Sequence, residues 1–178
     1  LSSAASDVYK RQVMSRETVL RQYVNQIKKD YDYVLLDCRP SLGMLVINAL
    51  SASDYVLIPV QAEYFAAENM TELVNTVQSI KRQINPKLKI GGVFMTMANE
   101  TNFRKDIVAS VKEAYGKHLP IMQTVIPATV RLAEISTAGH SIFKHEPKGR
   151  AAEAYRTLVK EVMDIGEKQR SKSANISR

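Results

Sequence analysis

The stretch that decides the fold prediction is Tyr33-Val34-Leu35-Leu36-Asp37-Cys38-Arg39-Pro40-Ser41-Leu42-Gly43. Four apolar or aromatic residues lead into an aspartate, and a loop containing Pro, Ser and Gly follows. An uninterrupted apolar run bounded by turn residues is typical of a strand that is buried on both faces. A carboxylate at the carboxyl end of such a strand lies where open α/β sheets bind their ligands. We therefore expect a buried strand over 33–36 and a candidate ligand-binding residue in Asp37.

The composition is that of a globular chain. With 178 residues, of which 45% are hydrophobic and 24% charged, the chain can form one domain with a core. No apolar run approaches the roughly eighteen residues that span a bilayer, and the first residues do not resemble a signal peptide. The single cysteine excludes an internal disulfide, and the three histidines show no metal-ligand spacing. We therefore expect a cytoplasmic protein that is not associated with membranes.

The positive charge is concentrated in the second half of the chain. Residues 1–100 carry 11 Lys and Arg against 10 Asp and Glu, whereas residues 101–178 carry 14 against 8. Such an asymmetry indicates that the C-terminal half meets a polyanion. A basic surface that only keeps the protein soluble explains the same numbers equally well.

Hydrophobic periodicity predicts strands that alternate with helices. The strands are expected at 33–36, 55–60, 90–97 and 122–126, and the helices at 15–29, 43–52, 66–83, 102–116, 129–137 and 150–165. Because the strands are continuously apolar, they predict an α/β fold in which helices cover both faces of a mostly parallel sheet. Residues 1–12 are expected to be a disordered or extraneous segment, 13–166 one domain, and 167–178 a basic flexible tail.

An apolar strand that ends in Asp has the form of a Walker B element, in which the carboxylate holds a water of a nucleotide-bound Mg²⁺. The motif alone is weak. Many α/β proteins place an Asp after a strand to cap the next helix, and from these residues alone the capping interpretation of Asp37 is the better one.

The surrounding sequence changes this balance, because a set of short motifs occurs in a fixed order. They are Asp37-Cys38-Arg39-Pro40-Ser41-Leu42-Gly43, Ile47-Asn48-Ala49-Leu50, Ile58-Pro59-Val60-Gln61-Ala62-Glu63-Tyr64-Phe65-Ala66, Thr96-Met97, Val125-Ile126-Pro127, Val130-Arg131-Leu132-Ala133-Glu134 and Pro147-Lys148-Gly149-Arg150-Ala151-Ala152-Glu153-Ala154-Tyr155. Together they resemble the ParA/Soj family of deviant-Walker-A partition ATPases, within the MinD/ParA superfamily. The resemblance covers about residues 15–162 and implies a three-layer, P-loop NTPase-like fold.

The resemblance also identifies what the chain lacks. Family members open with a strand and a Lys-Gly-Gly-Val-Gly-Lys-Thr-type loop that holds the phosphates. The sequence contains no Gly-Lys-Thr or Gly-Lys-Ser. We therefore expect a C-terminal portion of such an ATPase, without the N-terminal strands and phosphate loop and inactive by itself. A natural short form that regulates a full-length protein is the alternative.

The resemblance implies a role for each matching residue. Asp37 becomes the Walker B carboxylate that binds Mg²⁺ through water, and ATP and Mg²⁺ become the cofactors of the full-length parent. The loop of Arg39, Pro40, Ser41 and Gly43 becomes a switch that senses the γ-phosphate, although Arg39 replaces a proline common in the family. The positions expected near the nucleotide or the dimer interface are Gln61, Glu63, Met97 and Pro127. Loop polarity explains the first two as well, and core packing explains Met97.

The resemblance further implies partners. ATP-bound family members form homodimers, bind double-stranded DNA without sequence preference and respond to a ParB-like centromere-binding protein, which places them on the nucleoid in the cytoplasm. The positions matching the DNA-binding pattern are Lys117, Lys148 and Arg150, and Arg104, Lys105, Lys112 and Arg156 extend the patch. Two alternatives remain. One is another deviant-Walker ATPase, MinD-like or cobyrinate-synthase-like, and the other is a non-catalytic DNA-binding module.

Overall fold

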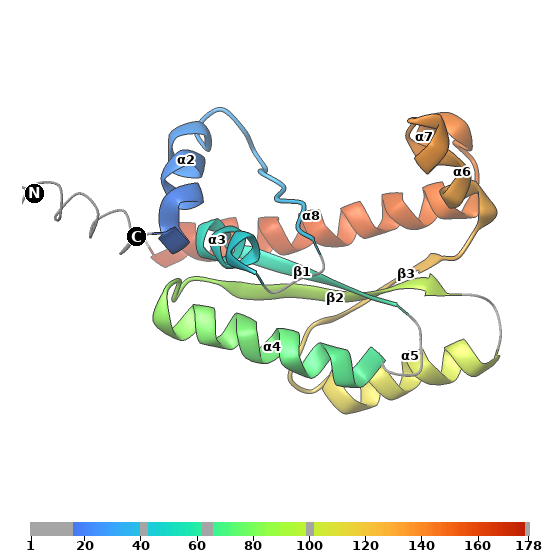
Figure 1. Ribbon diagram of the computed structural model, residues 1–178, viewed down its shortest axis with the longest axis horizontal. Coiled ribbons are helices and arrows are strands. Elements are labelled where there is room, and N and C mark those ends of the chain that lie inside the picture. Colours follow the sequence, from blue (N-terminus) through green and yellow to red (C-terminus); the bar gives the residue numbers. More distant parts are fainter. Residues whose placement is uncertain (1–15, 40–42, 62–65, 99–101, 177–178) are drawn as a thin grey trace, which may run out of the picture. The chain divides into compact units, whose positions relative to one another are not determined.

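The computed structural model describes residues 16–39, 43–61, 66–98 and 102–176 (Figure 1). A 3₁₀ turn, η1 (Arg16–Thr18), comes first, and seven α-helices and three strands follow it among the described residues. The helices are α2 (Val19–Ile27), α3 (Met44–Ala52), α4 (Ala66–Gln83), α5 (Asn102–Tyr115), α6 (Val130–Ala138), α7 (Ile142–His145) and α8 (Arg150–Ile176), and the strands are β1 (Tyr55–Gln61), β2 (Lys89–Ala98) and β3 (Ile121–Pro127).

The three strands form one parallel sheet in the order β1-β2-β3. β2 pairs in parallel with β3, with Val93 opposite Ile121 and Ala98 opposite Pro127. The N–H of Lys89 donates to the carbonyl of Asp54 at one end of β1, and the Thr96 hydroxyl lies 3.4 Å from the carbonyl of Val60 at its other end. The earlier residue of β2 thus contacts the start of β1 and the later residue contacts its end, so the two strands run in the same direction. The predicted α/β class with a parallel sheet is therefore confirmed.

The chain divides into two compact units, and the first comprises Leu1–Val56 and Thr71–Lys89. Among its described residues, α2 packs on α3, and polar side chains tie the helix ends together. Arg21 donates to the carbonyls of Ser51 and Ile84 at 2.7 and 3.1 Å. The buried amide of Asn85 donates to the carbonyls of Leu50 and Ser53 at 3.0 and 2.7 Å. Each of these bonds satisfies a carbonyl that the end of a helix leaves without an intrahelical partner.

The second unit comprises Leu57–Met70 and Ile90–Arg178 and holds the apolar core beneath α8. Met122 and Ile126 of β3 pack with Leu158 of α8, and partly buried apolar side chains from β1, β2, α6 and α8 surround them. On the other face of the strands lies α5, whose Val111 is buried (Figure 1). Helices thus cover both faces of this part of the sheet, as continuous apolar strands require.

The predicted strand over 33–36 does not form, and that prediction is wrong for this chain. Residues 33–39 are extended but belong to no strand, and the side chain of Leu35 is 85% exposed. A strand exists only where a neighbour completes its ladder of N–H and C=O groups, and the described sheet ends at β1 and β3. The apolar run favours burial between neighbours, but the described residues do not supply those neighbours.

The last helix is longer than predicted. Instead of ending near residue 165, α8 continues through Gly166 to Ile176. One glycine in a helix interior costs only about 1 kcal/mol relative to alanine, and the residues beyond it include several good helix formers and no proline. The helical backbone therefore extends through most of the segment predicted as a flexible tail.

Candidate functional site

Three of the predicted nucleotide-proximal residues meet at the carboxyl edge of the parallel sheet. Gln61 is the last residue of β1, Met97 is the penultimate residue of β2, and Pro127 ends β3. The ends of β2 and β3 are joined by a 3.0 Å hydrogen bond from the N–H of Ala128 to the carbonyl of Ala98. This edge is the one at which open α/β sheets bind ligands.

Met97 has an unusual backbone conformation that the sequence analysis did not anticipate. Its φ of 53° makes it the one non-glycine residue with positive φ among those described, and its side chain is 54% exposed. A side chain in this left-handed region costs roughly 1–2 kcal/mol, and such strain is concentrated at binding sites and switches. The bend turns an apolar side chain outward at the ligand edge. No sequence signal marks it, because a methionine at a strand end is usually a core residue.

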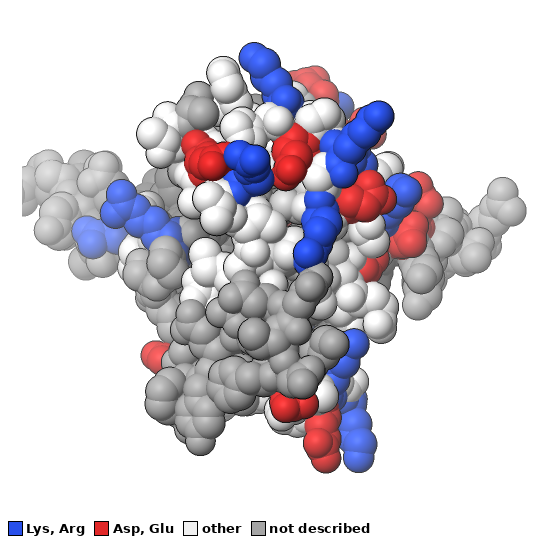
Figure 2. Space-filling view, turned by 90° about the vertical axis from the view of Figure 1, so that its right-hand side faces the viewer, with Lys and Arg blue, Asp and Glu red and all other residues white. Residues whose placement is uncertain are grey.

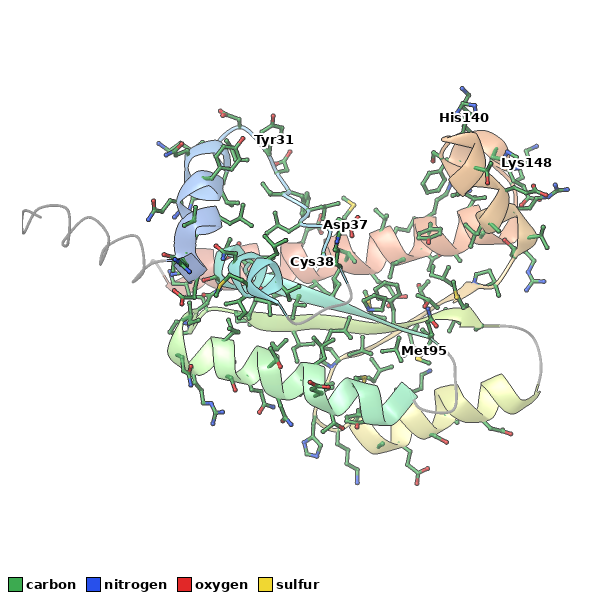
Figure 3. All side chains as sticks on the ribbon, in the orientation of Figure 1. Tyr31, Asp37, Cys38, Met95, His140 and Lys148 are labelled. Carbon is green, nitrogen blue, oxygen red and sulfur yellow. The ribbon has the colours of Figure 1, made fainter. Side chains whose placement is uncertain are left out.

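Asp37 lies in the first unit, at an exposed position of the extended segment 33–39 (Figure 3). It does not cap the helix that follows. The N-cap position of α3 is occupied by Gly43, whose carbonyl accepts hydrogen bonds from the N–H groups of Val46 and Ile47. Asp37 therefore does not have the helix-capping role that was the alternative to ligand binding.

The neighbour of Asp37 is the only cysteine of the chain. Partial burial and the nearby carboxylate of Asp37 both raise the pKa of the Cys38 thiol, because each disfavours the thiolate. Cys38 is therefore held as a neutral thiol. Of the other predicted switch residues, Arg39 is exposed, whereas Pro40 and Ser41 lie outside the described residues, as does Glu63.

The described residues include no group of three or more His, Cys, Asp or Glu side chains that could hold a metal ion. None of the described helices is both long and apolar enough to cross a membrane.

The three predicted DNA-binding residues fall into two places. Lys117 lies in the turn after α5 and before β3, whereas Lys148 and Arg150 lie after β3, in the turn that leads into α8 and at its first residue. The turn after α5 and the start of α8 lie at opposite ends of β3, whose seven residues span about 20 Å (Figure 1). Lys117 therefore does not share a local patch with Lys148 and Arg150. Figure 2 shows the side of the molecule that lies on the right in Figure 1, and there basic side chains are interspersed with acidic ones.

Ion pairs fix the corner formed by α6 and α7. Arg131 and Glu134 form the surface pair expected from their spacing, at 2.9 Å, and the ring Nε2 of His145 lies 3.2 Å from the same carboxylate oxygen. The hydrogen bond from Arg131, followed by that from His145, holds the pKa of Glu134 below its ordinary value. Glu134 therefore neutralises part of the positive charge of this corner.

Comparison with known proteins identifies the family. A family model described as an AAA domain matches residues 2–90. The sporulation initiation inhibitor protein Soj of Bacillus subtilis is 43% identical over 154 residues, which are 86% of this chain. The chain belongs to the ParA/Soj family. The chromosome partitioning protein ParA of Myxococcus xanthus is 37% identical over 150 residues, or 84% of the chain.

The chain matches only part of the length of each relative. The chain spans 60% of the length of the Bacillus subtilis Soj protein and 52% of the Myxococcus xanthus ParA protein. Among solved structures, an ATP complex of Cyanothece McdA has a TM-score of 0.68 over 92% of this chain and 61% of its own, at 19% identity, which shows a shared fold. Cobyrinic acid a,c-diamide synthase from Mycobacterium smegmatis, with a bound ATP analogue and magnesium, reaches 0.66 over 84% of this chain and 57% of its own, at 30% identity.

Proposed function

We propose that the chain is part of a ParA-type ATPase that segregates DNA. In the complete protein, ATP and Mg²⁺ favour a dimer, the dimer binds double-stranded DNA without sequence preference on the nucleoid, and a ParB-like partner stimulates hydrolysis. The observation that carries this proposal is the 43% identity to Soj over 154 residues. The carboxyl ends of β1, β2 and β3, which carry Gln61, Met97 and Pro127, support it, because open α/β sheets bind their ligands at that end.

Asp37 suits the magnesium side of such a site. Mg²⁺ commonly takes one or two protein carboxylates and fills its remaining positions with waters and phosphate oxygens. Asp37 is an exposed carboxylate that does not cap α3, so it is available to hold a water of the ion. A bound Mg²⁺ would neutralise negative charge on the β- and γ-phosphates. Met97 would offer its exposed side chain to the adenine ring, beside Pro127.

The phosphate side of the site does not fit these 178 residues, which contain no Gly-Lys-Thr or Gly-Lys-Ser. Loop amides and lysines provide most of the phosphate binding and much of the charge stabilisation in such ATPases. We therefore propose that this chain does not hydrolyse ATP alone and that the complete enzyme requires the segment its relatives have in addition.

A chimaera tests the proposal. The portion of Bacillus subtilis Soj that this chain does not match would be joined to residue 13, and ATP turnover would be measured with and without DNA. We expect turnover in the chimaera, none in the isolated chain, and loss of turnover on Asp37→Ala. Asp30→Ala is the matched control, since Asp30 is also an exposed aspartate of the first unit. Turnover that survives Asp37→Ala would remove Asp37 from the site.

The alternative of a cobyrinate-synthase-like enzyme is favoured by one observation, the 30% identity to the diamide synthase. DNA binding discriminates between the two. For the ParA-type function, the chimaera should bind duplex DNA with an affinity that falls steeply with salt, and neutralising Lys148 should lower the salt slope by about one unit. An absence of DNA binding at low salt would favour the synthase-like alternative.

A further inference from the structure

Backbone hydrogen bonds close the turn that carries Lys148, between α7 and α8. The N–H of Glu146 donates to the carbonyl of Ile142 at the end of α7, the N–H of Gly149 donates to the carbonyl of Glu146 at 3.0 Å, and the N–H of Glu153 donates to the carbonyl of Gly149 at 3.0 Å. A Cβ atom on Gly149 would lie 2.3 Å from a carboxylate oxygen of Glu146, so the glycine admits that side chain. Lys148 stands at the exposed tip of this turn (Figure 3).

Arg156, on the second turn of α8, reaches back to the same turn. Its Nη2 donates to the carbonyl of Pro147 at 2.7 Å, and its Nη1 donates to Glu153 at 3.4 Å. Its guanidinium carbon lies 5.3 Å from the centroid of the Phe143 ring, within the range of a cation–π contact. One side chain thus joins α8 to the turn and to α7.

These contacts engage the guanidinium of Arg156 within its own corner of the fold. It donates to a carbonyl and a carboxylate and lies near an aromatic ring, while 41% of the side chain is exposed. A planar guanidinium can donate in its own plane while it stacks on a ring, and an ammonium group cannot do both. The contacts that hold the turn therefore depend on an arginine. The expectation that Arg156 extends the DNA-binding patch does not explain these contacts.

We propose that Arg156 is a positioning residue that clamps the Pro147–Gly149 turn and the Phe143 ring onto α8 and thereby fixes how Lys148 and Arg150 are presented to phosphates. The DNA-facing part of this inference rests on the proposed function. Sequence spacing cannot reveal the clamp, because the pairing of Arg156 with the Pro147 carbonyl and the Phe143 ring depends on the angle between α7 and α8.

The test compares Arg156→Lys, Arg156→Gln, Lys148→Gln and Lys160→Gln in the 178-residue chain. Lys160 is exposed on α8 and controls for the loss of one charge. Exchange of the amide hydrogens of Gly149 and Glu153 reports on the turn without DNA. We expect both Arg156 variants to speed this exchange by about two- to tenfold, the change that one ordinary hydrogen bond produces, and Lys160→Gln to leave it unchanged. Unchanged exchange in both Arg156 variants refutes the clamp.

Binding of duplex DNA by the same four variants of the chimaera, with ATP and Mg²⁺ and over a range of salt concentrations, tests the second half of the inference. Arg156→Lys and Arg156→Gln should weaken binding by about two- to tenfold with the wild-type salt slope, whereas Lys148→Gln should lower the slope by about one. A lower slope in Arg156→Gln with restoration in Arg156→Lys would make Arg156 a phosphate contact and overturn the proposal. If the chimaera without further substitution binds no DNA, the proposed function fails, and faster exchange in the variants of the chain still establishes the clamp.

Discussion

Replacing Glu161 by alanine should loosen the outer edge of β3. The carboxylate of Glu161, on α8, accepts hydrogen bonds from the N–H groups of Gln123 and Thr124 at 3.0 and 2.8 Å and from the Thr124 hydroxyl. The register between β2 and β3 shifts at this point, with Val93 opposite Ile121 but Met95 opposite Val125. The helix thus supplies the acceptors that a neighbouring strand would otherwise provide.

The size of the effect of Glu161→Ala depends on which hydrogen-bond partners of Glu161 can reach water. Gln123 is exposed, so water replaces Glu161 at its amide at little cost, whereas Thr124 is buried and would keep an unsatisfied amide and hydroxyl. Leaving such buried groups unpaired costs roughly 1–3 kcal/mol each. For the two groups we expect a total of about 2–6 kcal/mol in the local opening free energy, which corresponds to roughly 30- to 25,000-fold faster exchange of the Thr124 amide hydrogen.

Hydrogen exchange resolved by residue measures this effect directly. The internal reference is the Val93 amide, which donates to the carbonyl of Pro120 at 2.8 Å and does not involve Glu161. Glu167→Ala is the matched variant, because Glu167 is an exposed glutamate farther along α8. Equal acceleration of Thr124 exchange in the Glu161 and Glu167 variants, or none in either, would refute the assignment of Glu161 as the partner of this strand edge.

Three further perturbations test the packing and the electrostatics. Asn85→Ala removes two hydrogen bonds to backbone carbonyls from a buried amide and should lower the free energy of unfolding by about 2–3 kcal/mol in a urea titration; a change below half a kcal/mol would contradict it. Gly92→Ala would place a Cβ 2.6 Å from the sulfur of Met122 and should cost about 1–3 kcal/mol by overpacking, and an unchanged urea midpoint would show that the methionine moves aside freely. Asp37→Asn should lower the pKa of Cys38, because it removes one of the two causes that raise it, so that alkylation of the thiol reaches half its maximal rate at a lower pH; identical pH profiles for both proteins would exclude the electrostatic contact.

The part of the fold that local patterns specify is predictable from the sequence. Apolar residues at helical spacing place α4 at its observed bounds, and the continuous apolar runs of β1, β2 and β3 predict a parallel sheet. The order of short motifs leads to the ParA/Soj family, and the family model and the Soj relative support the same assignment. For the site, the sequence predicts that Gln61, Met97 and Pro127 follow strands, and parallel topology then brings them to one edge.

Other features depend on contacts that no local pattern contains. The apolar run at 33–36 predicts a strand by itself, but pairing and burial come from neighbouring strands, and residues 33–39 remain extended and exposed. The acceptors at the edge of β3 come from a glutamate 37 residues away, and the outward turn of Met97 is a backbone strain that surrounding structure imposes.

The sequence by itself thus determined the fold class, the family and the residue types available at the ligand edge, because periodicity and motif order are properties of the chain alone. Only the tertiary structure decided that Lys117 stands apart from Lys148, and that Arg156 contacts the Pro147 carbonyl and the Phe143 ring. The physical reason is the same in both cases. A charge has a sign that composition reveals, but its role depends on which partners the packing of helices and strands brings within hydrogen-bonding distance.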